Sequence, residues 1–205
     1  MTKNPYAGKF ITFEGIDASG KSEQFKRWRN VLQAYHEAQF KKMFFTKEPD
    51  TDHSSGIEIY DLLLGRHSTF KLADLHPFEF QSRYFRNRIW HYRARVIPNL
   101  AKEFHVVSDR GIASMSFGVS SPHEFRPLMG IQEQAFEGAE VPLIWPDAIL
   151  IYDVPSDVAR QRMLERGKEL DAFEQDLDFQ MRVRWNYLSF AKLYPNCHVI
   201  DGSGQ

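Results

Sequence analysis

The clearest chemical signal in the sequence is a phosphate-binding pattern near its N-terminus. The pattern G-x-x-x-x-G-K-[ST] is matched in full by Gly15, Ile16, Asp17, Ala18, Ser19, Gly20, Lys21 and Ser22. Glycines allow such a loop to fold closely around a phosphate, so that several backbone N–H groups point at the anion. The lysine reaches the β- and γ-phosphates of a nucleotide, and the hydroxyl after it can bind Mg²⁺. The segment therefore predicts a nucleoside triphosphate site in which Lys21 is catalytic and Ser22 is a metal ligand.

A chance glycine turn is the alternative interpretation of this segment. Its surroundings favour phosphate binding, because the β-branched and aromatic run at residues 9–13 predicts a strand directly before the loop. Apolar residues at helical spacing after Lys21 predict a helix directly behind it. A helix that begins there adds the positive end of its dipole to the anion site.

Strand and helix patterns alternate along the rest of the chain. The expected strands cover residues 9–13, 42–46, 105–108, 148–152 and 198–200. The expected helices lie after residue 21, at 54–65, 77–102, 127–137 and 156–166, and from about 176 to 194, with a kink near Pro98. Because strand, helix and strand in succession form a right-handed parallel unit, the predicted class is α/β. We expect a five-stranded, doubly wound parallel sheet with helices on both faces.

Length, charge and cysteine content narrow the class of protein. The 205 residues fit one domain, and a formal net charge of -1 argues against a broadly basic surface for nucleic acid. The single cysteine, Cys197, cannot form an internal disulfide, and no stretch reaches the roughly 20 apolar residues that span a bilayer. These features predict a cytoplasmic protein with no membrane partner.

The phosphate-binding segment also carries a family resemblance. Together with the strand residues before it, from Phe10 onward, it resembles the opening of thymidylate kinases. Further segments resemble landmarks of that family in the same order: Thr46-Lys47-Glu48-Pro49, Tyr84-Phe85-Arg86-Asn87-Arg88, Ser108-Asp109-Arg110, the strand at 146–154, and Arg162 with Arg166. The resemblance covers nearly the whole chain. It implies a single P-loop NTPase domain over residues 1–205 with a mobile lid at about 162–175.

The resemblance implies roles for residues around the phosphates. Asp109 would position Mg²⁺ or its water shell, and Arg110 would bridge the donor and acceptor phosphates and neutralise the charge between them. A surface ion pair is the alternative role for Arg110. Asp17 would accept a hydrogen bond from the acceptor sugar. Lys47 would bind the acceptor phosphate where the family usually has arginine, with a point charge in place of a bidentate fork.

Four more residues receive roles in the same way. Ser114 matches a serine that follows the aspartate-arginine pair and would contact the acceptor. Glu48 would organise metal or water, or would form an ion pair at the strand end. Arg162 and Arg166 lie four residues apart on one helix face and could close over the ATP phosphates as catalytic lid residues. A solvated basic helix face is the alternative for these two arginines.

The acceptor base is expected at Tyr84 and Arg88, which lie one helical turn apart. The tyrosine ring would stack on a pyrimidine while the arginine donates to a carbonyl oxygen. A basic helix face that pairs with acids elsewhere, and a surface that binds a polynucleotide, are the alternatives. The family's usual polar residues are missing nearby, because Gly111 stands in place of a tyrosine or histidine and 117–119 reads Phe-Gly-Val.

The resemblance implies ATP-dependent, Mg²⁺-assisted phosphorylation of a nucleoside monophosphate, with dTMP converted to dTDP for dTTP biosynthesis. It also implies a homodimer. One alternative is a kinase for a modified pyrimidine deoxynucleotide or for a nucleotide within DNA. The other is a nucleotide-binding regulator without catalysis, against which the complete set of Lys21, Ser22, Asp109 and Arg110 argues.

Overall fold

A five-stranded parallel sheet forms the centre of the protein. The computed structural model describes residues 2–39, 42–165, 167 and 172–204. The strand order is β3-β4-β2-β6-β7, and all neighbouring strands are parallel. The bounds are β2 Phe10–Glu14, β3 Met43–Lys47, β4 His105–Asp109, β6 Ala148–Asp153 and β7 Cys197–Asp201. The predicted α/β class and the five-stranded parallel sheet are confirmed.

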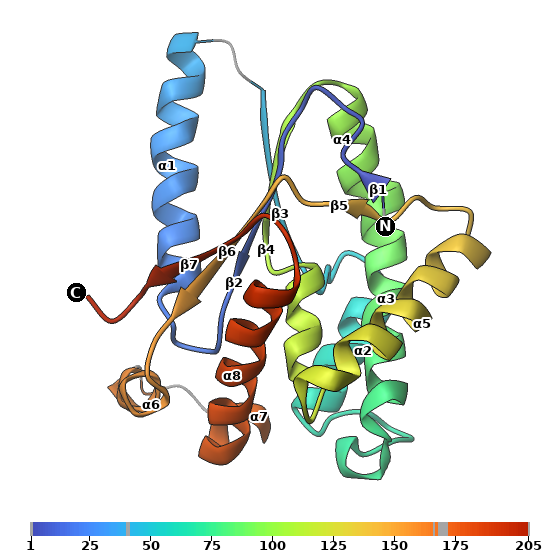
Figure 1. Ribbon diagram of the computed structural model, residues 1–205, viewed down its shortest axis with the longest axis vertical. Coiled ribbons are helices and arrows are strands. Elements are labelled where there is room, and N and C mark those ends of the chain that lie inside the picture. The colour runs from blue at the N-terminus through green and yellow to red at the C-terminus, as the bar shows by residue number, and fades with distance from the viewer. Residues whose placement is uncertain (1, 40–41, 166, 168–171, 205) are drawn as a thin grey trace.

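Helices cover both faces of this sheet (Figure 1). α1 (Lys21–Gln39) lies on one face, and the other face is covered by α3 (Pro77–His91), α4 (Ile97–Ala101) and α8 (Leu177–Leu193). α5 (Phe125–Gly138) packs against α3. The shorter helices lie toward the carboxyl ends of the strands: α2 (Ser54–Leu63), α6 (Ser156–Glu165) and α7 (Ala172–Gln175).

Alternating residues of β2 anchor both faces of the sheet. Phe13 is fully buried and packs with Phe25 and Trp28 of α1. Phe10 is fully buried on the opposite side, where its ring meets Tyr92 edge to face. Burial of one such side chain stabilises the fold by roughly 1.5–3 kcal/mol. β2 is therefore packed firmly from both sides, which fixes the loop that follows it.

The helix expected over residues 77–102 is divided into three parts. α3 is followed by a π-helical turn at Tyr92–Val96 and then by α4. Pro98 lies in the first turn of α4, and its ring nitrogen cannot donate the hydrogen bond that would continue a regular helix. The regular α-helix is thus interrupted by a π-helical turn just before Pro98, and Val96 and Leu100 are fully buried.

Several short elements were not expected from the sequence. β1 (Thr2–Lys3) pairs with β5 (Ile144–Trp145) in a separate parallel sheet. 3₁₀ helices lie at Leu72–Asp74, Ile112–Phe117 and Pro122–Glu124. Two-residue strands and single turns carry too little periodicity to be recognised in a sequence. Across the described parts of the chain, every helix is too short or too polar to span a bilayer.

Candidate active site

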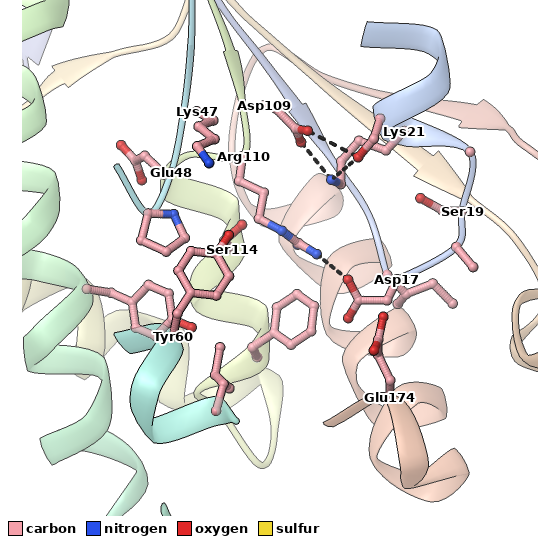
Figure 2. A pocket seen from close by; sticks show the side chains of 18 residues that line it. Asp17, Ser19, Lys21, Lys47, Glu48, Tyr60, Asp109, Arg110, Ser114 and Glu174 are labelled. Carbon is pink, nitrogen blue, oxygen red and sulfur yellow. Dashed lines mark hydrogen bonds and ion pairs between the residues drawn. The ribbon is translucent and has the colours of Figure 1, made fainter. Parts of the chain in front are cut away.

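A pocket of about 320 Å³ lies at the carboxyl ends of β2, β3 and β4 (Figure 2). This edge is where open α/β sheets bind their ligands. Most of the residues singled out in the sequence line the pocket: Ile16, Asp17, Ala18, Ser19, Gly20, Lys21, Ser22, Lys47, Glu48, Tyr84, Asp109, Arg110 and Ser114. Residues not predicted for the site also line it: Pro49, Tyr60, Leu63, Phe117 and Glu174.

The phosphate-binding loop has the backbone geometry that its glycines permit. Gly15 does not line the pocket but forms the bend that leaves β2, with a φ of 142°. A Cβ atom on Gly15 would lie 2.6 Å from the Tyr152 carbonyl oxygen, so no other residue fits there. Gly20, with a φ of 87°, leads directly into α1. The start of that helix lines the pocket, where a helix N-terminus favours a bound anion.

Lys21, Ser22 and Asp109 meet at one end of the pocket. The Lys21 ammonium donates to one Asp109 oxygen at 2.6 Å, and the Ser22 hydroxyl donates to the other at 3.1 Å. Burial alone would raise the pKa of Asp109, but the neighbouring Lys21 keeps it below its ordinary value, so the carboxylate is ionised. Burial, and after it the nearby Arg110, lowers the pKa of Lys21, and Asp109 opposes that shift.

The oxygen atoms of Ser22 and Asp109 fit Mg²⁺, which prefers hard oxygen ligands and keeps several waters and phosphate oxygens in its shell. The hydroxyl and the carboxylate lie within hydrogen-bond distance of each other beside the loop. Within the described residues there is no cluster of three or more His, Cys, Asp or Glu side chains that would hold a metal by protein ligands alone. The site therefore suits a metal that arrives with the nucleotide.

Arg110 reaches from the end of β4 across the pocket toward the loop (Figure 2). Its Nη2 donates to Asp17 at 2.6 Å, and its Nη1 donates to the Gly15 carbonyl at 3.2 Å. The guanidinium carbon lies 4.8 Å from the centre of the Phe117 ring. Burial opposes the charge of Arg110, but Asp17 holds its pKa above the ordinary value. Asp17, expected to contact the acceptor sugar, thus binds Arg110 in this structure.

Lys47 and Ser114, both expected to contact the acceptor, line the pocket. Lys47 is exposed, and no ion pair is formed by its ammonium within the described residues. Ser114 donates to Glu14 at 2.7 Å, so its oxygen keeps lone pairs that can accept from a ligand. Lys47 is therefore an available cation beside the pocket, as its proposed role requires.

Arg88 does not line the pocket, in contrast to its expected role beside Tyr84. It is buried behind Glu48, with its Nε 2.7 Å from a Glu48 oxygen. Its two terminal nitrogens donate to the Gly111 carbonyl, at 2.8 Å, and to the Gln132 side chain. This ion pair joins α3 to the end of β3, and the contact between Arg88 and the acceptor base stays a prediction. Two roles were considered for Glu48, to organise metal or water and to form an ion pair at the strand end. The structure contains the ion pair, with Arg88.

His91 completes this buried network. Its Nδ1 lies 3.1 Å from the second Glu48 oxygen, and its Nε2 lies 2.7 Å from the Thr46 hydroxyl. Burial would raise the pKa of Glu48, but Arg88 and His91 together hold it below its ordinary value. The network joins β3, α3 and the loop after β4, and so fixes the wall of the pocket.

The apolar half of the pocket comes from residues on several elements. Tyr84 lines it as expected, and Pro49, Tyr60, Leu63 and Phe117 lie with it. Tyr60 is 37% exposed on α2. The sequence carried no signal that would bring α2 to the pocket, whereas Phe117 lies in the segment 117–119, where the sequence departs from the family pattern.

The lid arginines are only partly described. Arg162 lies beside the loop, 3.9 Å from where a Cβ of Gly20 would stand, and it donates to the carbonyls of Gly202 at 3.0 Å and Ser203 at 3.4 Å. It does not line the pocket. Arg166 and residues 168–171 of the expected lid lie outside the described residues.

The parallel sheet, the loop at residues 15–22 and the cationic pocket define the class of P-loop phosphotransferases. Comparison with known proteins narrows this class. A sequence model of the family "Thymidylate kinase" matches residues 13–205. Similar proteins, each named thymidylate kinase, come from Kosmotoga olearia (33% identity, covering 95% of this chain and 88% of the relative) and Neisseria gonorrhoeae (30%, covering 96% and 89%). A third relative, from Janthinobacterium, is 33% identical to this chain, and the alignment covers 96% of this chain and 89% of the relative.

The chain belongs to the thymidylate kinase family. The resemblance seen in the sequence is confirmed, and with it the prediction of a nucleoside monophosphate kinase.

The buried network predicts an unequal response to two matched substitutions. Glu48→Gln leaves Arg88 without its anion in the interior and should lower the free energy of unfolding by about 3 kcal/mol. Glu58→Gln, which loses partly exposed pairs with Arg83 and Arg86, should cost less than about 1 kcal/mol. Urea unfolding of both variants makes the comparison. Equal losses would contradict a structural role for the Glu48–Arg88 pair.

Proposed function

We propose that this protein transfers the γ-phosphoryl group of ATP to dTMP and releases ADP and dTDP. One observation carries the proposal: a single pocket joins the phosphate-binding loop to an available cation, Lys47, with Arg110 between them. The relatives named thymidylate kinase, at 30–33% identity over nearly the whole chain, support the choice of acceptor.

The donor half of the pocket would bind the triphosphate of ATP. Backbone N–H groups of the loop and the start of α1 face the phosphates, and the Lys21 ammonium lies beside them. Ser22 and Asp109 would hold Mg²⁺. The ion would neutralise negative charge on the triphosphate.

The acceptor half would bind the monophosphate. Lys47 would pair with its phosphate, and the apolar surface of Pro49, Leu63 and Tyr84 would pack on the base. The volume of about 320 Å³ lies within the range of small-molecule pockets. A modified pyrimidine nucleotide would use the same groups, so the acceptor has to be tested directly.

In the transfer, a phosphate oxygen of dTMP attacks the γ-phosphorus of ATP. The new oxygen–phosphorus bond forms as the bond to the oxygen bridging the β- and γ-phosphorus atoms breaks, and ADP leaves with that electron pair. Negative charge on the transferred group is greatest between the two nucleotides, where Arg110 and Lys21 lie. Such fixed cations provide much of the rate acceleration in phosphoryl transfer.

A homodimer, a mobile lid at about 162–175 and a cytoplasmic location stay predictions from the family resemblance. The lid prediction includes Arg162 and Arg166 as cations that close over the ATP phosphates.

An acceptor screen with ATP and Mg²⁺ tests the proposed function. The purified protein should convert dTMP faster than dUMP, dCMP or a single-stranded DNA oligonucleotide, measured as ADP release in a coupled assay. If the protein phosphorylated only one of the other acceptors, that compound would take the place of dTMP in the proposal. Binding of ATP without turnover of any acceptor would indicate a regulator in place of an enzyme.

Arg110→Ala provides a second prediction. Because the variant loses the cation between the two nucleotides, kcat for dTMP should fall by about 100-fold or more, while the affinity for ATP stays within about twofold. Arg126→Ala, on an exposed position of α5 outside the pocket, should change neither value. Steady-state kinetics and calorimetry provide the two measurements. Near-normal kcat in Arg110→Ala would refute the role of Arg110.

A further inference from the structure

Beneath Arg110 lies a buried chain of hydroxyl and carboxyl groups that the sequence did not predict. Glu14 is fully buried at the end of β2, and Tyr187 of α8 is almost fully buried beside it. One Glu14 oxygen accepts from the Tyr187 hydroxyl at 3.0 Å and from the Ser114 hydroxyl at 2.7 Å. Tyr187 in turn lies 3.4 Å from Nη1 of Arg110. Four separate segments therefore meet at this point.

The hydrogen bonds in this chain have a fixed direction. Arginine has only donors, so the Tyr187 oxygen must accept from Arg110. Burial and the Glu14 carboxyl raise the pKa of Tyr187 well above its ordinary value, so its hydroxyl keeps the proton that it donates to Glu14. Glu14 thus directs the lone pairs of Tyr187 toward the arginine.

The surroundings of Glu14 are unusual for a carboxyl group. Its second oxygen has no hydrogen-bond partner within the described residues, and none of the described cations forms an ion pair with it. A buried carboxyl without a paired cation is costly, and burial accordingly raises the pKa of Glu14, although Ser114, Arg110 and Tyr187 oppose that shift. Such a costly group suggests a role other than stability.

Tyr187 also supports Arg110 through a ring. The Phe117 ring lies edge to face with Tyr187, at 6.0 Å between centres, and the Arg110 guanidinium lies over the same Phe117 ring at 4.8 Å. On its other side Arg110 is drawn toward Asp17 by the 2.6 Å ion pair. The Tyr187 hydroxyl and the Phe117 ring therefore add to the Asp17 pair in fixing the Arg110 guanidinium.

We propose that Tyr187 and Glu14 are positioning residues that keep the Arg110 guanidinium between the donor and acceptor phosphates. Neither residue lines the pocket, so both act through Arg110. The inference rests on the proposed function, because it takes Arg110 as the group that stabilises the transferred phosphoryl.

A double-mutant cycle tests this inference. Tyr187→Phe keeps the ring but removes the hydroxyl, and it should lower kcat for dTMP by about 10-fold with less than about twofold change in KM for ATP, since small displacements of a catalytic group cost one to two orders of magnitude. In the Arg110→Ala background the same substitution should change kcat by less than about twofold, because the group that it positions is gone.

Tyr92→Phe is the matched control, because it also removes a buried tyrosine hydroxyl, one that donates to the Ile144 carbonyl at 3.1 Å. It should leave kcat unchanged in both backgrounds. Glu14→Gln, which keeps an acceptor oxygen but replaces the carboxyl group by an amide, provides a second variant should Tyr187→Phe fail to fold. It should lower kcat by about threefold, again only when Arg110 is present.

The failures of the two proposals are distinguishable. If Tyr187→Phe and Glu14→Gln are as active as the wild type while Arg110→Ala is impaired, the proposed function stands and this inference is overturned. An equal loss of kcat in both backgrounds also overturns it, because the residues would then act independently of Arg110. If the wild type phosphorylates no nucleotide, both proposals fall.

Discussion

The constraint on which this structure depends is the repulsion between two phosphate groups that must be brought together. Each carries negative charge, so the pocket must supply positive charge that is already in place before they meet. Lys21, Lys47 and Arg110 line this pocket, and carboxylates lie beside Lys21 and Arg110, where they relieve the repulsion between these two cations. Asp109 lies 2.6 Å from Lys21, and Asp17 lies 2.6 Å from Arg110. The two aspartates of the pocket thus hold the side chains of Lys21 and Arg110 in place.

Two buried networks provide the rigidity that this arrangement needs. Glu48, Arg88 and His91 join the end of β3 to α3 and to the Gly111 carbonyl after β4. Glu14 and Tyr187 join the end of β2 to α8. Buried charges are weak contributors to stability when compared with apolar packing, but breaking them is costly. They therefore fix the positions of strand ends more than they stabilise the fold.

Local features of this protein could be predicted from its sequence. The loop at 15–22, the five strands and the long helix rest on patterns within short segments, and the structure has them close to the expected bounds. Most predicted site residues line the pocket, because the carboxyl ends of parallel strands gather at one edge.

Contacts between distant segments could not be predicted in this way. Tyr187 and Glu14 are 173 positions apart, and no periodicity relates them. Arg88 lies on the expected helix, yet whether it faces the pocket or Glu48 depends on how that helix is rotated against β3. That rotation is set by contacts between segments far apart in the chain, which the pattern of a single sequence does not reveal.

The account depends most directly on the loop at 15–22 enclosing a triphosphate, with Lys21 as its cation. Titration calorimetry with a non-hydrolysable ATP analogue and Mg²⁺ measures the affinity of this site and the number of sites per chain. The account predicts one site per chain for the wild-type protein, and an affinity at least about 10-fold lower for Lys21→Ala, since the variant loses a charge-assisted contact to phosphate. Equal affinities for the two proteins, or no binding by the wild type, would contradict it.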